Sequence, residues 1–258
     1  MAVMTSNAGR LAWAKLVLMV EIRGDGTVTV GTPSISMRSY LSTQHLWMAH
    51  HCAQYAQYYE DRYRGQRPAF HIHLRGYIIA TVTESDAFVE ALINELFSDV
   101  FDNHNDERLK VFDAASHQRM TQHWRDSGFG KTTSILEKYE FALSLNAQAG
   151  FDKGAEPYQS MSLLISLRNW QVHYYPSNVS DADPHSLQAK LKSRFEPNSL
   201  MTGSGNAWFP DKALGAGCSA WAVSTAEAFA NNFVERFSYE PNYRSIQHPT
   251  DPPPLSGE

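Results

Sequence analysis

A long run of apolar residues at helical spacing is the feature that most constrains this chain. From about residue 73 to residue 101, small or apolar side chains recur every three or four positions, at Ile78, Val82, Ser85, Val89, Leu92, Ile93 and Leu96. This spacing is typical of a helix that buries one face. It predicts a helix over about 73–101 that packs against other helices along its whole length.

The polar edge of the same helix carries Glu84, Glu90, Asn94 and Glu95. Charged residues on the edge of an amphipathic helix usually form a solvated face. One or two of them can instead reach a functional site on a neighbouring element. We take Glu90 and Asn94 as the candidates for such a supporting role.

Other segments with the same period predict further helices, at about 42–63, 133–147, 157–175, 185–195 and 219–237. Ser134 is suited to cap the start of the second of these, and Gly150 to end it. Strand signals are confined to residues 15–31, where Asp25-Gly26 lies between two β-prone runs and predicts a hairpin. The fold class is therefore mainly α, an up-and-down helical bundle with a small N-terminal β-hairpin.

These signals divide the chain into three parts. Residues 1–68 form an N-terminal appendage of hairpin and helix, residues 69–240 the helical domain, and residues 241–258 a disordered, proline-rich tail. The tyrosines near the end of the first helix, Tyr55, Tyr58, Tyr59 and Tyr63, either line a seam between helices or stack on bases. We favour the seam.

Composition narrows the functional classes. Of the 258 residues, 43% are apolar, which is enough for a core, and no run of 18 apolar residues predicts a membrane span. Two cysteines indicate neither a disulfide framework nor a zinc ribbon and fit a cytoplasmic location. The net charge of −5 argues against a general duplex-DNA binder but allows a local site for one RNA strand.

The strongest candidate site is the end of the predicted 157–175 helix, where Arg168, Asn169 and His173 precede Pro176. A histidine can move a proton near neutral pH, and a guanidinium can hold a phosphate oxygen. Residues five apart diverge by about 140° on an ideal helix, so Arg168 and His173 of one chain do not both point straight at one small target. They could share one only if the long arginine side chain reaches round or the last turn unwinds near Tyr174. The structural alternative is a histidine at the negative end of the helix and an arginine paired with an acid.

The residues around this site resemble the HEPN superfamily. The resemblance covers roughly 70–237, and it rests on Leu136-Glu-Lys138-Tyr139, Phe151-Asp-Lys-Gly154, Pro157-Tyr158-Gln159, Leu167-Arg168-Asn169, His173-Tyr174, Phe209-Pro-Asp-Lys212 and Leu214-Gly-Ala-Gly-Cys218-Ser-Ala-Trp221-Ala222.

This resemblance implies a metal-independent endoribonuclease without a cofactor, in which Arg168, Asn169 and His173 are catalytic. It implies a homodimer that joins the Arg168/His173 helices of two chains around single-stranded RNA, in a toxin–antitoxin or phage-defence setting. Cleavage would use the ribose 2′-hydroxyl and leave a 2′,3′-cyclic phosphate. An antitoxin or nucleotidyltransferase partner is also implied, with Tyr175 as the candidate site of regulatory modification.

Two alternatives stay open. One is a catalytically inactive HEPN module that binds RNA or a protein partner and mediates dimerisation. The other is a metal-dependent hydrolase that uses His50, His51, His71 and His73, although no HExxH or carboxylate-rich motif accompanies these histidines.

Overall fold

The computed structural model describes residues 14–17, 20–22, 28–30, 34–66, 70–103, 107–126, 129–180, 182–237 and 241–249. The chain forms two compact units, Met1–Tyr40 and Leu41–Glu258. The sequence predicts a boundary near residue 68. The division falls earlier because the first helix buries one face against other helices of the second unit.

The N-terminal unit contains short strands. β1 (Ala14–Val17) pairs antiparallel with β4 (Ser34–Met37), and β2 (Val20–Ile22) pairs antiparallel with β3 (Val28–Val30). The turn predicted at Asp25-Gly26 lies outside the described residues. The hairpin as a whole therefore stays a prediction.

The second unit is helical, as the sequence predicted. Its longer helices are α1 (Ser42–Tyr63), α2 (Ile72–Phe101), α3 (Ala114–Asp126), α5 (Ile135–Leu145), α6 (Tyr158–Val172) and α8 (Ala216–Glu235). Shorter helical segments are η1 (Glu107–Val111), α4 (Phe129–Thr132), α7 (Ser186–Leu191), η2 (Ser199–Met201), η3 (Trp208–Lys212) and η4 (Asn242–Ser245). Among the described helices, none has both the length and the apolar character that a membrane crossing needs.

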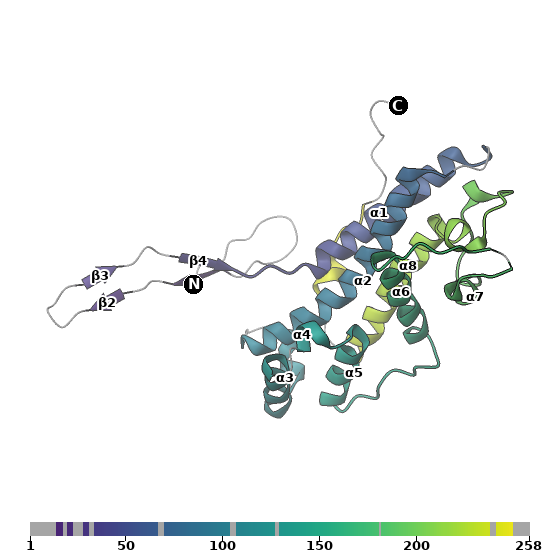
Figure 1. Ribbon diagram of the computed structural model, residues 1–258. Helices are drawn as coiled ribbons and strands as arrows, with labels where there is room; N and C mark the ends of the chain where they lie inside the picture. The colour runs from purple at the N-terminus through teal and green to yellow at the C-terminus, as the bar shows by residue number, and fades with distance from the viewer. Residues whose placement is uncertain are drawn as a thin grey trace. The chain divides into compact units, whose positions relative to one another are not determined.

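Helix α2 lies at the centre of this unit, in contact with α1, α3, α5, α6 and α8 (Figure 1). Its apolar face is buried as predicted, with Ile78, Val82, Val89 and Ile93 each 0% exposed. The helix is covered on several sides, so its polar residues also meet neighbouring helices. This central position brings side chains of α2 to the candidate site on α6.

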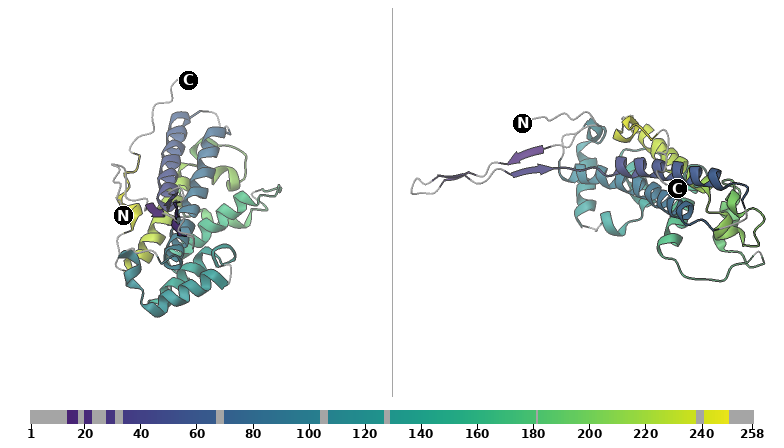
Figure 2. Two further views of the ribbon diagram at one scale, coloured as in Figure 1. Left: turned by 90° about the vertical axis from the view of Figure 1, so that its left-hand side faces the viewer. Right: turned by 90° about the horizontal axis from the view of Figure 1, so that it is seen from above.

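Helices α1 and α2 form an antiparallel pair, and the views in Figure 2 show them side by side. Near their connection, Tyr59 is 3% exposed and stacks at 5.7 Å from the ring of Tyr77, while Tyr55 stacks on the same ring at 4.9 Å. These tyrosines therefore line the seam between the two helices, which is the structural interpretation that we favoured.

In two helices of this unit, carboxylates from other helices cap the first backbone N–H groups. The backbone N–H groups of Leu41 and Ser42, at the start of α1, donate to Glu95 Oε1 of α2 at 2.7 and 2.8 Å. The N–H of Ala216, the first residue of α8, donates to Glu60 Oε2 of α1 at 2.6 Å. The cap of α1 therefore comes from α2 and not from the residue before α1.

The segment after α8 follows the helical body rather than forming a free tail. Tyr243 in η4 is 3% exposed, and its hydroxyl lies 2.9 Å from Asn231 Oδ1 of α8. Its ring also packs edge-on against Phe88 of α2 at 5.0 Å. The prediction of disorder is therefore wrong for residues 241–249, and residues 250–258 lie outside the described part of the chain.

Glycines at the start of α8 are required by close packing. A Cβ atom on Gly217 would lie 2.5 Å from the backbone oxygen of Glu196, and one on Gly215 would lie 2.5 Å from Asn198 Cα. Both neighbours are backbone atoms, which cannot move aside as the end of a flexible side chain can. Close packing in the fold therefore explains why glycine occupies positions 215 and 217.

We expect Gly217→Ala to lower the free energy of unfolding by roughly 1–3 kcal/mol, the usual cost of overpacking. Helix propensity alone favours alanine by about 1 kcal/mol, so a net loss would isolate the packing clash. Urea unfolding followed by circular dichroism measures the change. Gly205→Ala is the control, since a Cβ atom there meets nothing within 4 Å. Equal stability of the two variants would contradict the packing argument.

Candidate functional site

Arg168 projects from α6 onto α2, where it meets a buried acid. Its Nε donates to Asp86 Oδ2 at 2.6 Å, and the side chain of Asp86 is fully buried. The Arg168 side chain is itself 25% exposed. One edge of the guanidinium is therefore fixed against the core while the rest stays near the surface.

Asp86 is an unusual residue in an apolar helix face. Burial raises the pKa of its carboxyl from the ordinary value, and the neighbouring Arg168 opposes that rise. Its second oxygen, Oδ1, has no hydrogen-bond partner although it is buried. A buried charge of this kind costs stability unless it is paired, so Asp86 depends on Arg168.

Two further contacts orient the guanidinium. Arg168 Nη1 donates to Asn169 Oδ1 at 3.0 Å, and Nη2 lies 3.6 Å from Glu90 Oε2. Other N–H groups of the guanidinium stay available, because the hydrogen bonds to Asp86 and Asn169 use only part of its donor set. Such a fork can donate hydrogen bonds to two oxygens of a phosphate group.

A buried lysine extends the network. Lys138 of α5 is 0% exposed, and its Nζ donates to Asn94 Oδ1 at 2.9 Å and to the Gly130 carbonyl at 3.0 Å. The same nitrogen lies 3.6 Å from Glu90 Oε1. Burial lowers the pKa of Lys138, and the charge of Glu90 acts in the opposite direction.

The structure thus brings Arg168, Asn169, Glu90 and Asn94 together, all of which the sequence proposed. The sequence analysis missed Asp86 and Lys138. A signal for Asp86 was present, because Asp86, Glu90 and Asn94 are four apart and form one column on α2.

His173 lies apart from this network. It forms the C-terminal cap of α6, its side chain is exposed, and its backbone N–H donates to the Asn169 carbonyl at 2.9 Å. Within the described part of the chain, no hydrogen bond or ion pair joins His173 to Arg168. The divergence expected from their spacing therefore holds for a single chain.

Exposed apolar residues flank His173. Val172 is 57% exposed, Tyr174 is 54% exposed, and Tyr175 is 82% exposed. Large apolar side chains grouped on a surface often mark an interaction site. Tyr175, the candidate for modification, is accessible in this arrangement.

The four histidines of the metal-hydrolase alternative do not converge. His71 caps α2 by accepting a hydrogen bond from the Leu74 N–H at 3.3 Å, and it packs on Tyr63 with ring centres 4.5 Å apart. His51 stacks on Trp47 at 4.9 Å. Among the described residues, the group suited to a metal ion contains His50 but not the other three.

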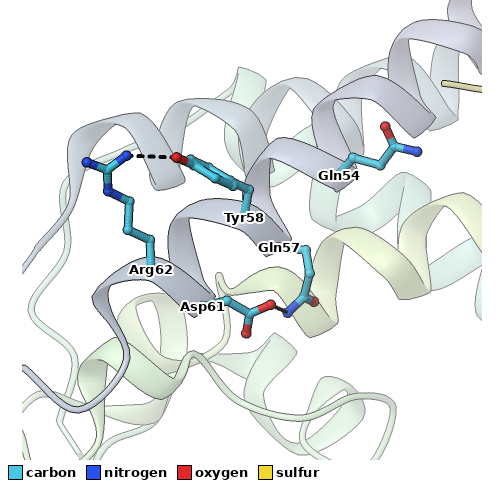
Figure 3. A pocket seen from close by; sticks show the side chains of 5 residues that line it. All are labelled: Gln54, Gln57, Tyr58, Asp61 and Arg62. Atoms are coloured by element: carbon cyan, nitrogen blue, oxygen red, sulfur yellow. Dashed lines mark hydrogen bonds between the residues drawn. The ribbon is translucent and has the colours of Figure 1, made fainter. Parts of the chain in front are cut away.

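A hollow of about 530 Å³ lies on the surface of α1. It is lined by Gln54, Gln57, Tyr58, Asp61 and Arg62 (Figure 3). Arg62 donates to the Tyr58 hydroxyl at 2.7 Å, and Gln57 donates to Asp61 at 2.8 Å. These two hydrogen bonds lie along a single helix, whereas the Arg168 network joins α2, α5 and α6.

Comparisons with known proteins do not extend this description. No family model, no curated protein and no solved structure matches the chain.

Proposed function

We propose that this chain is a HEPN-type, metal-independent endoribonuclease that cleaves single-stranded RNA as a homodimer. The supporting observation is the way in which Arg168 is held. Its Nε is fixed by the buried Asp86, and its Nη atoms remain near the surface beside Asn169. A guanidinium oriented before substrate arrives stabilises developing negative charge without reorganisation.

In the proposed homodimer, His173 of one chain can transfer protons beside Arg168 of the other chain. His173 is exposed at the end of α6 and does not contact Arg168 of its own chain. Two-fold symmetry would place two copies of His173 near two copies of Arg168. The exposed Val172, Tyr174 and Tyr175 offer apolar surface for that contact.

In the proposed reaction, one His173 removes the proton from the ribose 2′-hydroxyl. The 2′-oxygen then attacks the adjacent phosphorus, and Arg168 stabilises the charge on the non-bridging oxygens. The bond from phosphorus to the 5′-oxygen breaks, and that oxygen takes a proton from the second imidazole. The products are a 2′,3′-cyclic phosphate and a 5′-hydroxyl end, and Asn169 orients the guanidinium throughout.

One observation favours the inactive HEPN module instead. Arg168 is already paired with Asp86 and Glu90, so the structural role of an arginine that neutralises an acid accounts for its position. In that alternative the α6 surface binds RNA or a protein partner without turnover. The two functions differ in whether RNA is cleaved.

The test incubates purified protein and chelator with labelled single-stranded RNA. We expect wild type to leave cyclic-phosphate ends, and His173→Ala to reduce the rate by at least about 100-fold, the usual contribution of a general acid or base. Arg168→Lys should act similarly, since lysine keeps the charge beside Asp86 but loses the fork. RNA with a 2′-deoxy residue at the scissile position should resist cleavage.

Matched controls are available in the chain. His73→Ala removes an exposed histidine near a helix end, and Arg194→Lys changes an arginine paired with Glu156. Both should cleave at the wild-type rate. Cleavage that survives in His173→Ala would refute the residue assignment. RNA binding without cleavage in the wild type, unchanged by His173→Ala, would favour the inactive module.

A further inference from the structure

A second polar cluster joins three segments that are distant in sequence. His50 of α1 lies with its Nε2 at 3.1 Å from Glu227 Oε1 of α8. His248, which follows η4, places its Nε2 at 4.0 Å from the same carboxylate oxygen. The rings of His50 and His248 are 3.9 Å apart between centres.

The spacing of these groups is close to that of metal ligands. One ligand atom from each of the three residues lies within 4.8 Å of the other two. Ligands at about 2.0–2.1 Å from a tetrahedral ion are about 3.3 Å from one another. The His50–Glu227 distance already meets this value, and a small rotation of the His248 ring would bring its nitrogen into range.

The His248 ring also has an unsatisfied nitrogen. Its Nδ1 is buried without a hydrogen-bond partner, so the ring is incompletely satisfied by the described residues.

The geometry points to a binding site for one first-row divalent transition-metal ion of the zinc class, held by His50, Glu227 and His248. Two imidazoles and one carboxylate are ligands that such ions accept, and three protein ligands leave a fourth position for water. The side chains of the cluster are 23–35% exposed, so an ion can enter from solvent. The site is independent of the proposed ribonuclease, since it shares no residue with the Arg168 network.

The ion would fasten the segment after η4 to the helical body. That segment already touches α1 one turn beyond His50, where Gln54 Nε2 donates to the Pro249 carbonyl. A metal bound by residues from α1, α8 and this segment would link all three. Binding to the folded chain alone would raise its stability by mass action.

The test titrates metal-free, full-length protein with Zn²⁺ in competition with a chromophoric chelator. We expect one equivalent to bind to the wild type and a rise in the midpoint of thermal unfolding. His248→Ala should weaken binding by more than about 100-fold, beyond the effect of residues that only orient a ligand, and should lose the thermal shift. Glu227→Gln, which keeps the size of the side chain, should weaken binding as well.

The matched control is His45→Ala. His45 Nδ1 lies 2.6 Å from Glu84 Oε2 at similar exposure, but among the described residues no second imidazole completes that pair. This variant should bind Zn²⁺ as the wild type does. No stoichiometric binding by the wild type, or equal affinity in His248→Ala, would overturn the site and leave a hydrogen-bonded cluster. Neither result would bear on RNA cleavage, which is assayed with chelator present.

Discussion

Replacing Glu60 with alanine is expected to lower the free energy of unfolding by roughly 3–5 kcal/mol. Glu60 is 4% exposed, and its two oxygens accept from the backbone N–H groups of Ser199 at 2.8 Å and Ala216 at 2.6 Å. Its loss would leave the buried Ala216 N–H and the half-buried Ser199 N–H without this partner. Each buried donor without a partner costs about 1–3 kcal/mol. Urea unfolding followed by circular dichroism measures the effect.

Two other variants serve as comparisons for Glu60→Ala. Glu60→Gln keeps one oxygen but turns the other into an NH₂ group that faces a donor, so we expect an intermediate loss. Glu235→Ala is the control, because that side chain is 68% exposed and lies 3.6 Å from Arg244, where surface pairs contribute little. A loss below about 1 kcal/mol in Glu60→Ala would contradict the structural role of this residue.

Arg168→Ala is expected to destabilise the protein by roughly 3–5 kcal/mol at neutral pH, because it leaves Asp86 buried without its cation. The double variant Asp86→Leu/Arg168→Met should recover most of the loss, since a well-packed apolar pair can replace a buried ion pair. A double variant no more stable than Arg168→Ala would contradict this account.

The loss in Arg168→Ala should also depend on pH. The pKa of Asp86 is raised by burial, and Arg168 holds it down, so removing Arg168 raises it further. The folded variant then binds a proton more readily than the unfolded chain, and its stability falls as pH rises through that window. Unfolding curves at about pH 5 and about pH 7 should show a smaller penalty at the lower pH. Equal penalties would show that Asp86 titrates normally.

Regular helices were predictable because periodicity is a local signal. The α2 stripe placed that helix at about 73–101, and the structure has it at Ile72–Phe101. Ser134 caps α5 as expected, in a capping box with Glu137. Gly150 does not end α5 as expected. The helix stops at Leu145, and Ala147 has the positive φ of 51°.

Helix α3 is not among the helices that the sequence predicts, because its periodic signal is weak. Its buried positions are few, Ser116 and Met120 among them, so it shows no apolar stripe. Its start is fixed instead by Asp113, whose Oδ1 accepts from the Ser116 N–H at 2.7 Å. An aspartate three residues before a serine is too common to predict a helix without the tertiary contacts.

Residues of the candidate site could be predicted within each helix, but their pairing between helices could not. Arg168, Asn169, Glu90 and Asn94 were chosen from the sequence, and the structure groups them. Asp86 and Lys138 were missed because both are charged residues on buried faces, where a pattern of apolar residues gives no reason to look. Their pairing depends on how α2, α5 and α6 rotate against one another, which helical periodicity does not specify.

Carboxylates from other helices cap the first turns of α1 and α8, so the start of each helix depends on residues outside it. The residues before these helices, Leu41 and Gly215, provide no side-chain cap. Each first turn is completed only when another helix has docked, α2 for α1 and α1 for α8. The start of α8 is therefore a property of the assembled body rather than of its own residues, and local signals placed that start at Ser219, three residues late.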